Sequence, residues 1–193
     1  MAVSRAQPDE LRPWWPRIAV AEIAGDHRAG GIQIEAVDAS QLVPLRRQVL
    51  REGRDDVPLG HRDDDKVTSL HLGAVDEAGT VIGCLSLVLE DGPGPMPGSA
   101  GDSAPVRYQV RLTGMAVDPG WQRRRIGGRL LVVAEELAAA GDLAIWAAAR
   151  DSALEFYRRH GFVVVGDGFI GAMGLPHHHV VWEEATPHLR AGR

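Results

Sequence analysis

Apolar and polar residues alternate, or recur with helical spacing, along most of the chain. Alternation predicts a strand at 32–37, and the polar residues that follow would cap a helix reaching about residue 50. Two apolar runs, 67–75 and 81–89, flank a short segment with the composition of a hairpin turn. The first half of the sheet is therefore expected to be antiparallel.

The second half of the chain alternates strands with helices. A strand is expected at 108–117, and a helix with its apolar residues on one face is expected from about 124 to 140. The uninterrupted apolar run at 143–149 is typical of a central strand that is covered on both faces. The remaining expected elements are a helix at 151–160 and two strands at 162–165 and 178–183.

This order of elements predicts a mixed α/β fold, with a mostly antiparallel sheet of six to seven strands and helices on both faces. The strand-helix-strand unit at 108–149 is expected to form a right-handed parallel crossover. We expect one domain at 31–185, a loosely structured extension at 1–30 and a tail at 186–193. The segment at 91–105, rich in Gly, Pro and Ser, is expected to be a flexible loop.

The composition of the chain argues against two classes of binding partner, nucleic acids and membranes. The chain has 193 residues and a net charge of −5, which argues against an extended nucleic-acid surface. No apolar run approaches the ~20 residues that span a membrane, and the N-terminal residues lack the layout of a signal peptide. We therefore expect a cytoplasmic protein without nucleic-acid or membrane partners. The single cysteine, Cys84, excludes an intrachain disulfide and is expected to be a buried thiol.

The segment at 112–129 is the most informative one. It reads as a strand, a Pro-Gly turn and the basic, glycine-containing start of a helix. A helix N-terminus offers unpaired N–H groups and the positive end of the dipole, so this order favours a polyphosphate ligand. The segment is not a P-loop, and the Gly166-x-Gly-x-x-Gly171 pattern is attributed to chance because no helix is expected after it.

Two motifs in this segment and after it resemble the GNAT acetyltransferase superfamily. Gln122-Arg-Arg-Arg-Ile-Gly127 is similar to the family's Gln/Arg-x-x-Gly-x-Gly/Ala motif, with Arg125 where the family usually has glycine. Ala153-Leu-Glu-Phe-Tyr-Arg-Arg-His-Gly-Phe162 is similar to the second cofactor motif, with Arg150 in place of the common Asn that precedes it. The segments 45–50, 63–65, 68–72 and 174–177 further resemble the ElaA-type branch.

The resemblance implies an N-acetyltransferase that transfers the acyl group of acetyl-CoA directly to an amine of a small molecule or peptide. It implies that Met115 and Val117 pair with the pantetheine arm, which requires the sheet to open beside them. Tyr157 would donate a proton to the leaving thiolate; alternatively, it only packs its helix on the sheet. The expected acetyl-CoA-binding residues are Met115, Ala116, Val117, Gln122, Arg123, Arg124, Arg125, Ile126, Gly127, Gly128 and Arg129.

The acceptor side is less defined by the sequence. Arg46, His71 and His177 are candidates for binding the acceptor, although Arg46 and Arg47 would alternatively be exposed helix residues. The 63–65 acidic run would attract a cationic amine or simply be solvated. Three adjacent histidines on a strand point to alternate faces, so no metal site is expected at 177–179. Candidates for the general base are Glu35, Asp65, His71, Glu90 and His177.

Two other functions remain open at this point. The first alternative is a non-catalytic module that binds or senses acetyl-CoA. The unusual Arg125 and Arg150 leave this alternative open. The second alternative is a nucleotide-binding protein that uses the same helix start to bind ATP or NAD. For the assembly, the resemblance allows a monomer or a homodimer.

Overall fold

The computed structural model describes residues 20, 22–23, 30–54, 63–90, 108–141, 143–171 and 173–182. The predicted loop at 91–105, the predicted tail and nearly all of the predicted N-terminal extension lie outside these residues. The described elements are β1 (Gln33–Ala36), α2 (Ala39–Leu50), β2 (Ser69–Val75), β3 (Val81–Leu89), β4 (Tyr108–Val117), η2 (Pro119–Trp121), α3 (Ile126–Ala140), β5 (Ala144–Arg150), η3 (Asp151–Ala153), α4 (Leu154–Arg159), β6 (Val163–Ile170) and β7 (Pro176–Trp182). None of the described helices is long and apolar enough to cross a membrane.

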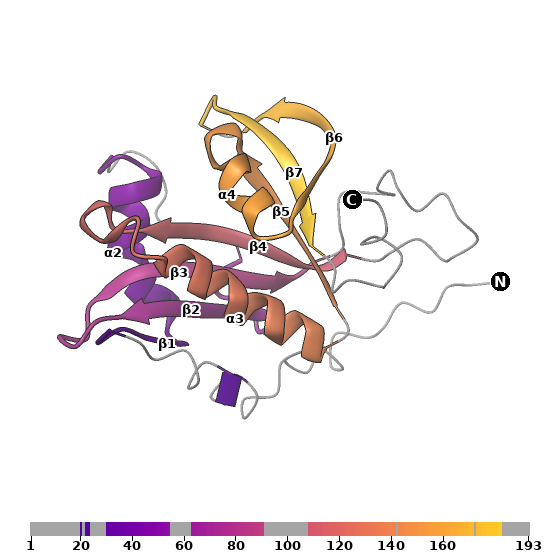
Figure 1. Ribbon diagram of the computed structural model, residues 1–193. Helices are drawn as coiled ribbons and strands as arrows, with labels where there is room; N and C mark the ends of the chain where they lie inside the picture. The colour runs from indigo at the N-terminus through magenta and orange to yellow at the C-terminus, as the bar shows by residue number, and fades with distance from the viewer. Residues whose placement is uncertain are drawn as a thin grey trace.

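The strands form one seven-stranded sheet in the order β1-β2-β3-β4-β5-β7-β6 (Figure 1). Every neighbouring pair is antiparallel except β4 and β5, which are parallel and joined through α3. The predicted mixed, mostly antiparallel sheet and the parallel crossover are therefore confirmed.

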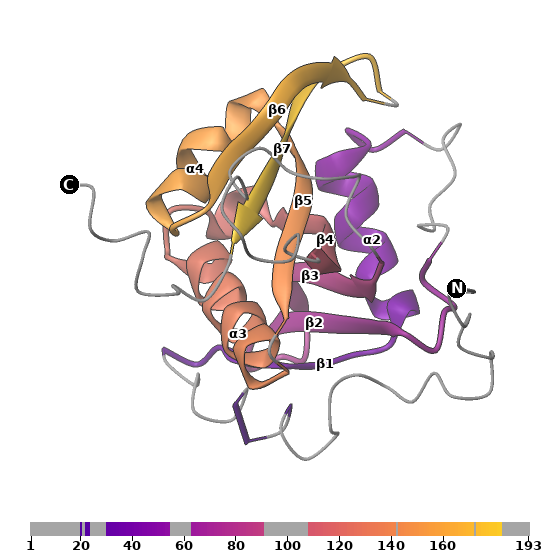
Figure 2. The same ribbon diagram turned by 90° about the vertical axis from the view of Figure 1, so that its right-hand side faces the viewer.

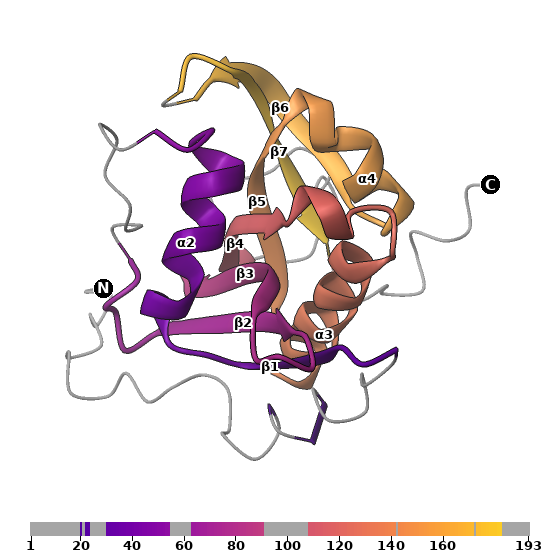
Figure 3. The same cartoon turned by 90° about the vertical axis from the view of Figure 1, so that its left-hand side faces the viewer.

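Helices cover both faces of the sheet, as Figures 2 and 3 show. On one face, α3 and α4 enclose the main core, which includes Leu130, Tyr157 and Phe162. On the other face, α2 packs Leu42 and Leu45 against Cys84 and Ala116. Cys84 is buried, as predicted, because it lies on the strand face that α2 covers.

The helix limits follow from local chemistry. Asp38 and Gln41 form a capping box at the start of α2, in which the Asp38 N–H donates to Gln41 Oε1 at 2.8 Å. The helix predicted from about residue 124 begins instead at Ile126, because η2 and a left-handed residue, Arg125, occupy the preceding turn.

The last hairpin is longer than the sequence predicted. β6 reaches Ile170 and β7 begins at Pro176, whereas alternation predicted 162–165 and 178–183. The pairing of β6 with β7 is irregular between Val165 and Phe169, where Gly166 has a φ of 67°. Such a bulge breaks the alternation of apolar and polar residues, which hides the second part of the strand. The Gly166–Gly171 pattern belongs to this hairpin and opens no helix, as predicted.

Gly83 on β3 sets how closely α3 approaches the sheet. A Cβ at this position would lie 2.7 Å from Ile126 Cγ2 and 3.2 Å from Leu130 Cδ1. The first distance requires the Ile126 side chain or its helix to shift, and the second is a tight contact; Ile126 is the first residue of α3.

We therefore expect Gly83→Ala to lower the free energy of unfolding by about 1–3 kcal/mol through overpacking. Urea denaturation of Gly83→Ala, Ile126→Ala and the double variant measures the coupling of the two sites. Because Ile126→Ala removes the methyl group that clashes, the double variant should lose less stability than the sum of the two single variants. Strict additivity would contradict the close approach.

Candidate active site

The central strand β4 loses one of its two neighbours half-way along its length. Its pairing with β5 ends at Leu112 opposite Ala147. Beyond that point the residues 148–150 of β5 remain paired with β7, while β4 stays paired with β3 as far as Val117. The two strands start side by side and diverge (Figure 1). The opening beside Met115 and Val117 that pairing with a pantetheine arm requires is therefore present, and it starts at Thr113.

A bulge in β4 lies where the divergence begins. Gly114 and Met115 together oppose the single residue Leu85 of β3, because Ala116 pairs with Cys84 and Thr113 with Ser86. Gly114 has a φ of 61°, the left-handed region that glycine adopts without steric cost. The extra residue turns the strand at the edge of the opening.

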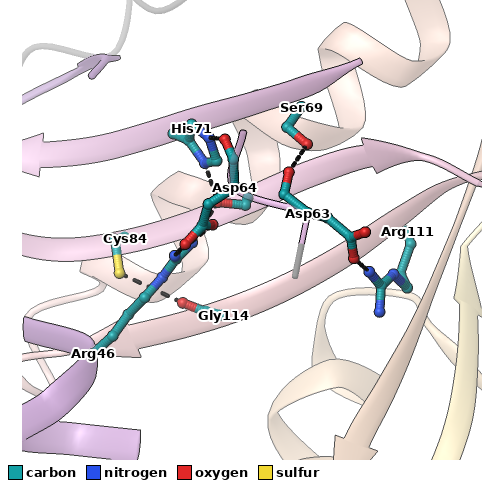
Figure 4. A network of polar contacts seen from close by, with 9 residues as sticks. Arg46, Asp63, Asp64, Ser69, His71, Cys84, Arg111 and Gly114 are labelled. Carbon is teal, nitrogen blue, oxygen red and sulfur yellow. Dashed lines mark hydrogen bonds and ion pairs between the residues drawn. The ribbon is translucent and has the colours of Figure 1, made fainter. Parts of the chain in front are cut away.

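Arg46 of α2 packs directly under this bulge (Figure 4). A Cβ at Gly114 would lie 2.8 Å from Arg46 Nε. The guanidinium is 2% exposed and donates from Nη1 to the Asp64 carboxylate at 2.8 and 3.0 Å, and from Nη2 to Ser86 Oγ at 2.5 Å. The alternative that Arg46 is an exposed helix residue is therefore wrong. Its two Nη atoms are engaged inside the protein.

His71 completes this network from β2. Its Nδ1 lies 2.6 Å from Ser86 Oγ, and its Nε2 lies 3.1 Å from the Asp64 carbonyl oxygen. Burial lowers the pKa of His71, so the imidazole is neutral near pH 7, with Ser86 donating to Nδ1 and Nε2 donating to the carbonyl. Both ring nitrogens of this candidate base are thus already hydrogen-bonded.

A second ion-pair cluster lies next to this network. The Asp63 carboxylate pairs with Arg111 and, at 2.7 Å, with Lys66 Nζ. Arg111 Nε also lies 3.0 Å from Glu90, and the guanidinium stands over the Trp146 ring at 5.9 Å. The simple solvated loop considered for 63–65 is wrong for Asp63, which is 2% exposed; it holds for Asp65, which is exposed.

Three of the candidate bases lie away from the opening of the sheet. Asp65 and His71 line a cavity of about 540 Å³ between the start of α2 and the segment 64–71, which includes no residue of β4 or β5. Glu35 lies on β1, at the edge of the sheet, three strands from β4.

Tyr157 reaches the opening from the other face of the sheet. α4 places its hydroxyl 3.7 Å from Met115 Sδ, while its ring packs edge-on against Phe156 and Phe162. The side chain is 6% exposed, and burial raises the pKa of Tyr157. The phenol therefore stays protonated over the physiological range and can act only as a proton donor there.

The segment between β4 and α3 forms a short turn followed by two residues in the left-handed region. Asp118 accepts from the Gly120 N–H at 2.8 Å, and Gln122 Nε2 donates to the Val117 carbonyl at 3.2 Å. Arg123 and Arg125 have φ values of 61° and 63°, and residues that alternate into this region form anion-binding concavities. Within the described residues, no side chain caps α3 and its first turn has no acidic residue. This arrangement is compatible with an anionic ligand, and the binding of a pyrophosphate here stays a prediction.

A family model for the acetyltransferase (GNAT) domain matches residues 68–164, which hold both the opening in the sheet and Tyr157. The chain belongs to the GNAT acetyltransferase family.

Solved GNAT structures share the fold at low sequence identity. A putative N-acetyltransferase from Lactobacillus plantarum aligns with a TM-score of 0.62 and 16% identity over 80% of this chain and 99% of its own. ElaA from Escherichia coli aligns with a TM-score of 0.58 and 16% identity over 79% of this chain and 99% of its own. An aminoglycoside 6'-N-acetyltransferase complexed with coenzyme A aligns with a TM-score of 0.54 and 17% identity over 78% of this chain and 96% of its own. No curated protein matches the chain by sequence.

The GNAT motif residues that are glycines here pack the two cofactor motifs together. A Cβ at Gly127 would lie 3.3 Å from both Met115 Cε and Phe156 Cζ. A Cβ at Gly128 would lie 2.7 Å from the His160 ring. These glycines therefore let the start of α3 approach α4, a role that the motif alone does not reveal.

The arginines of the GNAT loop have different surroundings. Arg124 stacks on Trp121 with its guanidinium 4.8 Å from the ring centroid. Arg129 donates from Nη2 to the Ile32 carbonyl at 3.0 Å, and burial lowers its pKa. Arg129 is thus held towards β1, and its expected contact with phosphate stays a prediction.

The two departures from the GNAT motifs both have structural explanations. Arg125 adopts the left-handed conformation that the usual glycine would adopt at lower cost. Arg150 donates from Nη2 to the Leu50 carbonyl at 3.0 Å and so caps the C-terminus of α2.

The face of β5, β6 and β7 that looks towards α2 carries an aromatic cluster. His179 lies edge-on to Trp146 at 5.9 Å and 4.7 Å from Phe169, which also stacks on His177 at 5.7 Å. His178 points to the other face, where its Nδ1 lies 2.7 Å from Asp151 Oδ1. The alternation predicted for the three histidines is confirmed, and the described residues contain no group of ligands for a metal ion. His177 was predicted to bind the acceptor and His179 was not, although the two lie on the same face of β7.

Arg46→Met should lower the free energy of unfolding by about 3–5 kcal/mol, because it leaves the Asp64 charge without its buried partner. Arg159→Met is the matched control, since its pair with Glu155 is 74% and 65% exposed. That pair contributes less than about 0.5 kcal/mol. Equal and small effects in urea denaturation would show that the Arg46 pair is not structural.

Arg125→Gly should raise the free energy of unfolding by about 0.5–1 kcal/mol, since relief of the left-handed strain outweighs the added flexibility of glycine. Arg124→Gly is the control because Arg124 lacks a positive φ and stacks on Trp121. It should destabilise the protein. Thermal and urea denaturation measure both variants, and a loss of stability in Arg125→Gly would contradict the strain.

Proposed function

We propose that this chain is an acetyl-CoA-dependent N-acetyltransferase that transfers the acyl group directly to an amine of a small molecule or peptide. One observation carries the proposal. The edge of β4 from Thr113 to Val117 faces an opening in the sheet, and the Tyr157 hydroxyl reaches the same opening, 3.7 Å from Met115 Sδ. A strand edge that has no neighbouring strand and lies beside a proton donor suits an amide-rich thioester.

The residues present fit acetyl-CoA. The uncapped start of α3 and the two left-handed residues before it suit the pyrophosphate, which the N–H groups of 122–127 would hold. The backbone of Met115 and Val117 would pair with the pantetheine arm as an added strand does. The coenzyme A in the aminoglycoside 6'-N-acetyltransferase, which shares the fold, supports a CoA thioester as the donor.

The chemistry follows from this placement. The N–H of Met115, at the bulge, would stabilise the oxyanion that develops on the thioester carbonyl. The amine nitrogen attacks the carbonyl carbon, the carbon–sulfur bond breaks, and Tyr157 gives its hydroxyl proton to the departing sulfur. The raised pKa of Tyr157 means that the phenol carries its proton before the reaction starts.

Tyr157→Phe tests the role of the hydroxyl. We expect kcat to fall by about 10²–10⁴-fold, the usual contribution of a positioned proton donor, while the Kd for acetyl-CoA is unchanged. Thiol release with a panel of primary amines measures kcat, and calorimetry measures Kd. An unchanged kcat would mean that Tyr157 only packs α4 on the sheet.

The same measurements separate the other candidate functions. Acetyl-CoA binding by the wild-type protein without thiol release for any amine would favour a sensor. Binding of ATP or NAD without binding of acetyl-CoA would overturn the proposal. Arg125→Gly is expected to bind CoA as well as the wild-type protein or better, because the loop conformation is kept at lower cost; weaker binding would assign the Arg125 side chain a direct contact.

A further inference from the structure

Ala148 marks an opening on the face of the sheet that looks towards α2. It lies in β5 between the buried residues Ala147 and Ala149, yet it is itself exposed. Its face is that of Trp146 two residues earlier, which contacts Arg111, and of Arg150 two residues later, which reaches α2. Ala148 is also the first residue of β5 after its pairing with β4 ends. Solvent therefore reaches the sheet here, at the closed end of the opening between β4 and β5.

His179 is the side chain next to this opening. It pairs with Ala148 across β5 and β7, and directly opposed residues have Cβ atoms about 4.5–5.5 Å apart. Trp146 and Phe169 hold its ring through aromatic contacts. Among the described residues, no group hydrogen-bonds to either ring nitrogen of His179. Burial lowers the pKa of His179, so its imidazole is neutral near pH 7.

The other titratable groups near this face already have ion-pair or hydrogen-bond partners. Asp63, Asp64 and Glu90 are paired with arginines, and His71 has both ring nitrogens hydrogen-bonded.

His177 lies on the same face as His179 but pairs with Arg150. Arg150 occupies the β5 position next to it with a long side chain that reaches the Leu50 carbonyl, and His177 Nδ1 lies 2.7 Å from the Leu175 carbonyl. By contrast, the β5 residue that pairs with His179 is Ala148, whose side chain is only a methyl group.

We propose that His179 is the general base that accepts the proton of the acceptor amine, directly or through one water. This assignment rests on the proposed acetyltransferase function. It also places the acceptor on the α2-facing side of the sheet, over Ala148, with Tyr157 on the opposite side. The thioester would then lie between base and acid.

The proton balance is closed by these two residues and solvent. An ammonium acceptor loses one proton to a ring nitrogen of His179, and the free amine forms the new carbon–nitrogen bond. As the carbon–sulfur bond breaks, Tyr157 protonates the sulfur. The second proton leaving the nitrogen returns to Tyr157 through solvent, and His179 releases its proton to solvent. The net products are the amide, the free thiol and one proton.

The test is the pH dependence of kcat/KM for His179→Gln, with acetyl-CoA and two accepted amines of different pKa. In the wild-type protein we expect activity to fall as the pH drops through a value below 6.5, at the same pH with both amines. In His179→Gln this limb should disappear and kcat at pH 7.5 should fall about 10²-fold or more, with the Kd for acetyl-CoA unchanged.

Three further variants sharpen the result. His178→Asn is the matched control, because its amide nitrogen takes the place of Nδ1 towards Asp151 on the other face; its pH profile should equal that of the wild type. Ala148→Leu should raise the KM of the amine without changing the Kd for acetyl-CoA. His177→Gln should keep the acid limb.

Two outcomes would overturn the assignment while leaving the proposed function intact: acetyl transfer with an unchanged limb in His179→Gln, or loss of the limb in His177→Gln instead. Absence of acetyl-CoA binding or of transfer in the wild-type protein would instead overturn both the assignment and the function on which it rests.

Discussion

The contact between Arg46 and Gly114 is the constraint on which the rest of the site depends. A guanidinium lies against the backbone of the central strand at a place where no side chain would fit. It is held there by Asp64 and Ser86, which come from a loop and from the neighbouring strand. The bulge above it is where β4 stops pairing with β5. A buried charge that costs free energy to desolvate is thus retained at the point where the sheet has to open.

The two faces of the sheet present different chemical groups to the opening. The face covered by α3 and α4 presents backbone N–H groups and the Tyr157 hydroxyl. The face towards α2 presents an aromatic and imidazole surface around Ala148. In a continuous sheet these surfaces would be separated by paired backbone. Here a ligand that adds to β4 would be reached from both sides, which matches a reaction with one proton donor and one proton acceptor.

Local patterns in the sequence predicted the features that depend on residues close together in the chain. The alternation of β1, the capping of α2 and the crossover through α3 follow from short-range periodicity, and Tyr157 was singled out by a motif. Arg46 could not be predicted in the same way, because its partners Asp64 and Ser86 lie 18 and 40 residues along the chain. Arg129 and Arg150 bond to carbonyls 97 and 100 residues away. His179 could have been recognised from its shared face with His177, had the full length of β7 been known.

The bond from Arg150 to the Leu50 carbonyl has a mechanical consequence. Beyond Leu112 the sheet consists of two leaves: β1 to β4 with α2, and β5 to β7 with α4. The paired segment of β4 and β5 acts as their hinge, and the Arg150 guanidinium joins the leaves again on the α2 side, at the far end of β5. Any swing that widens this side must stretch that bond. The bond therefore limits how far the two parts of the sheet can separate on the side where we propose that the acceptor enters, over Ala148.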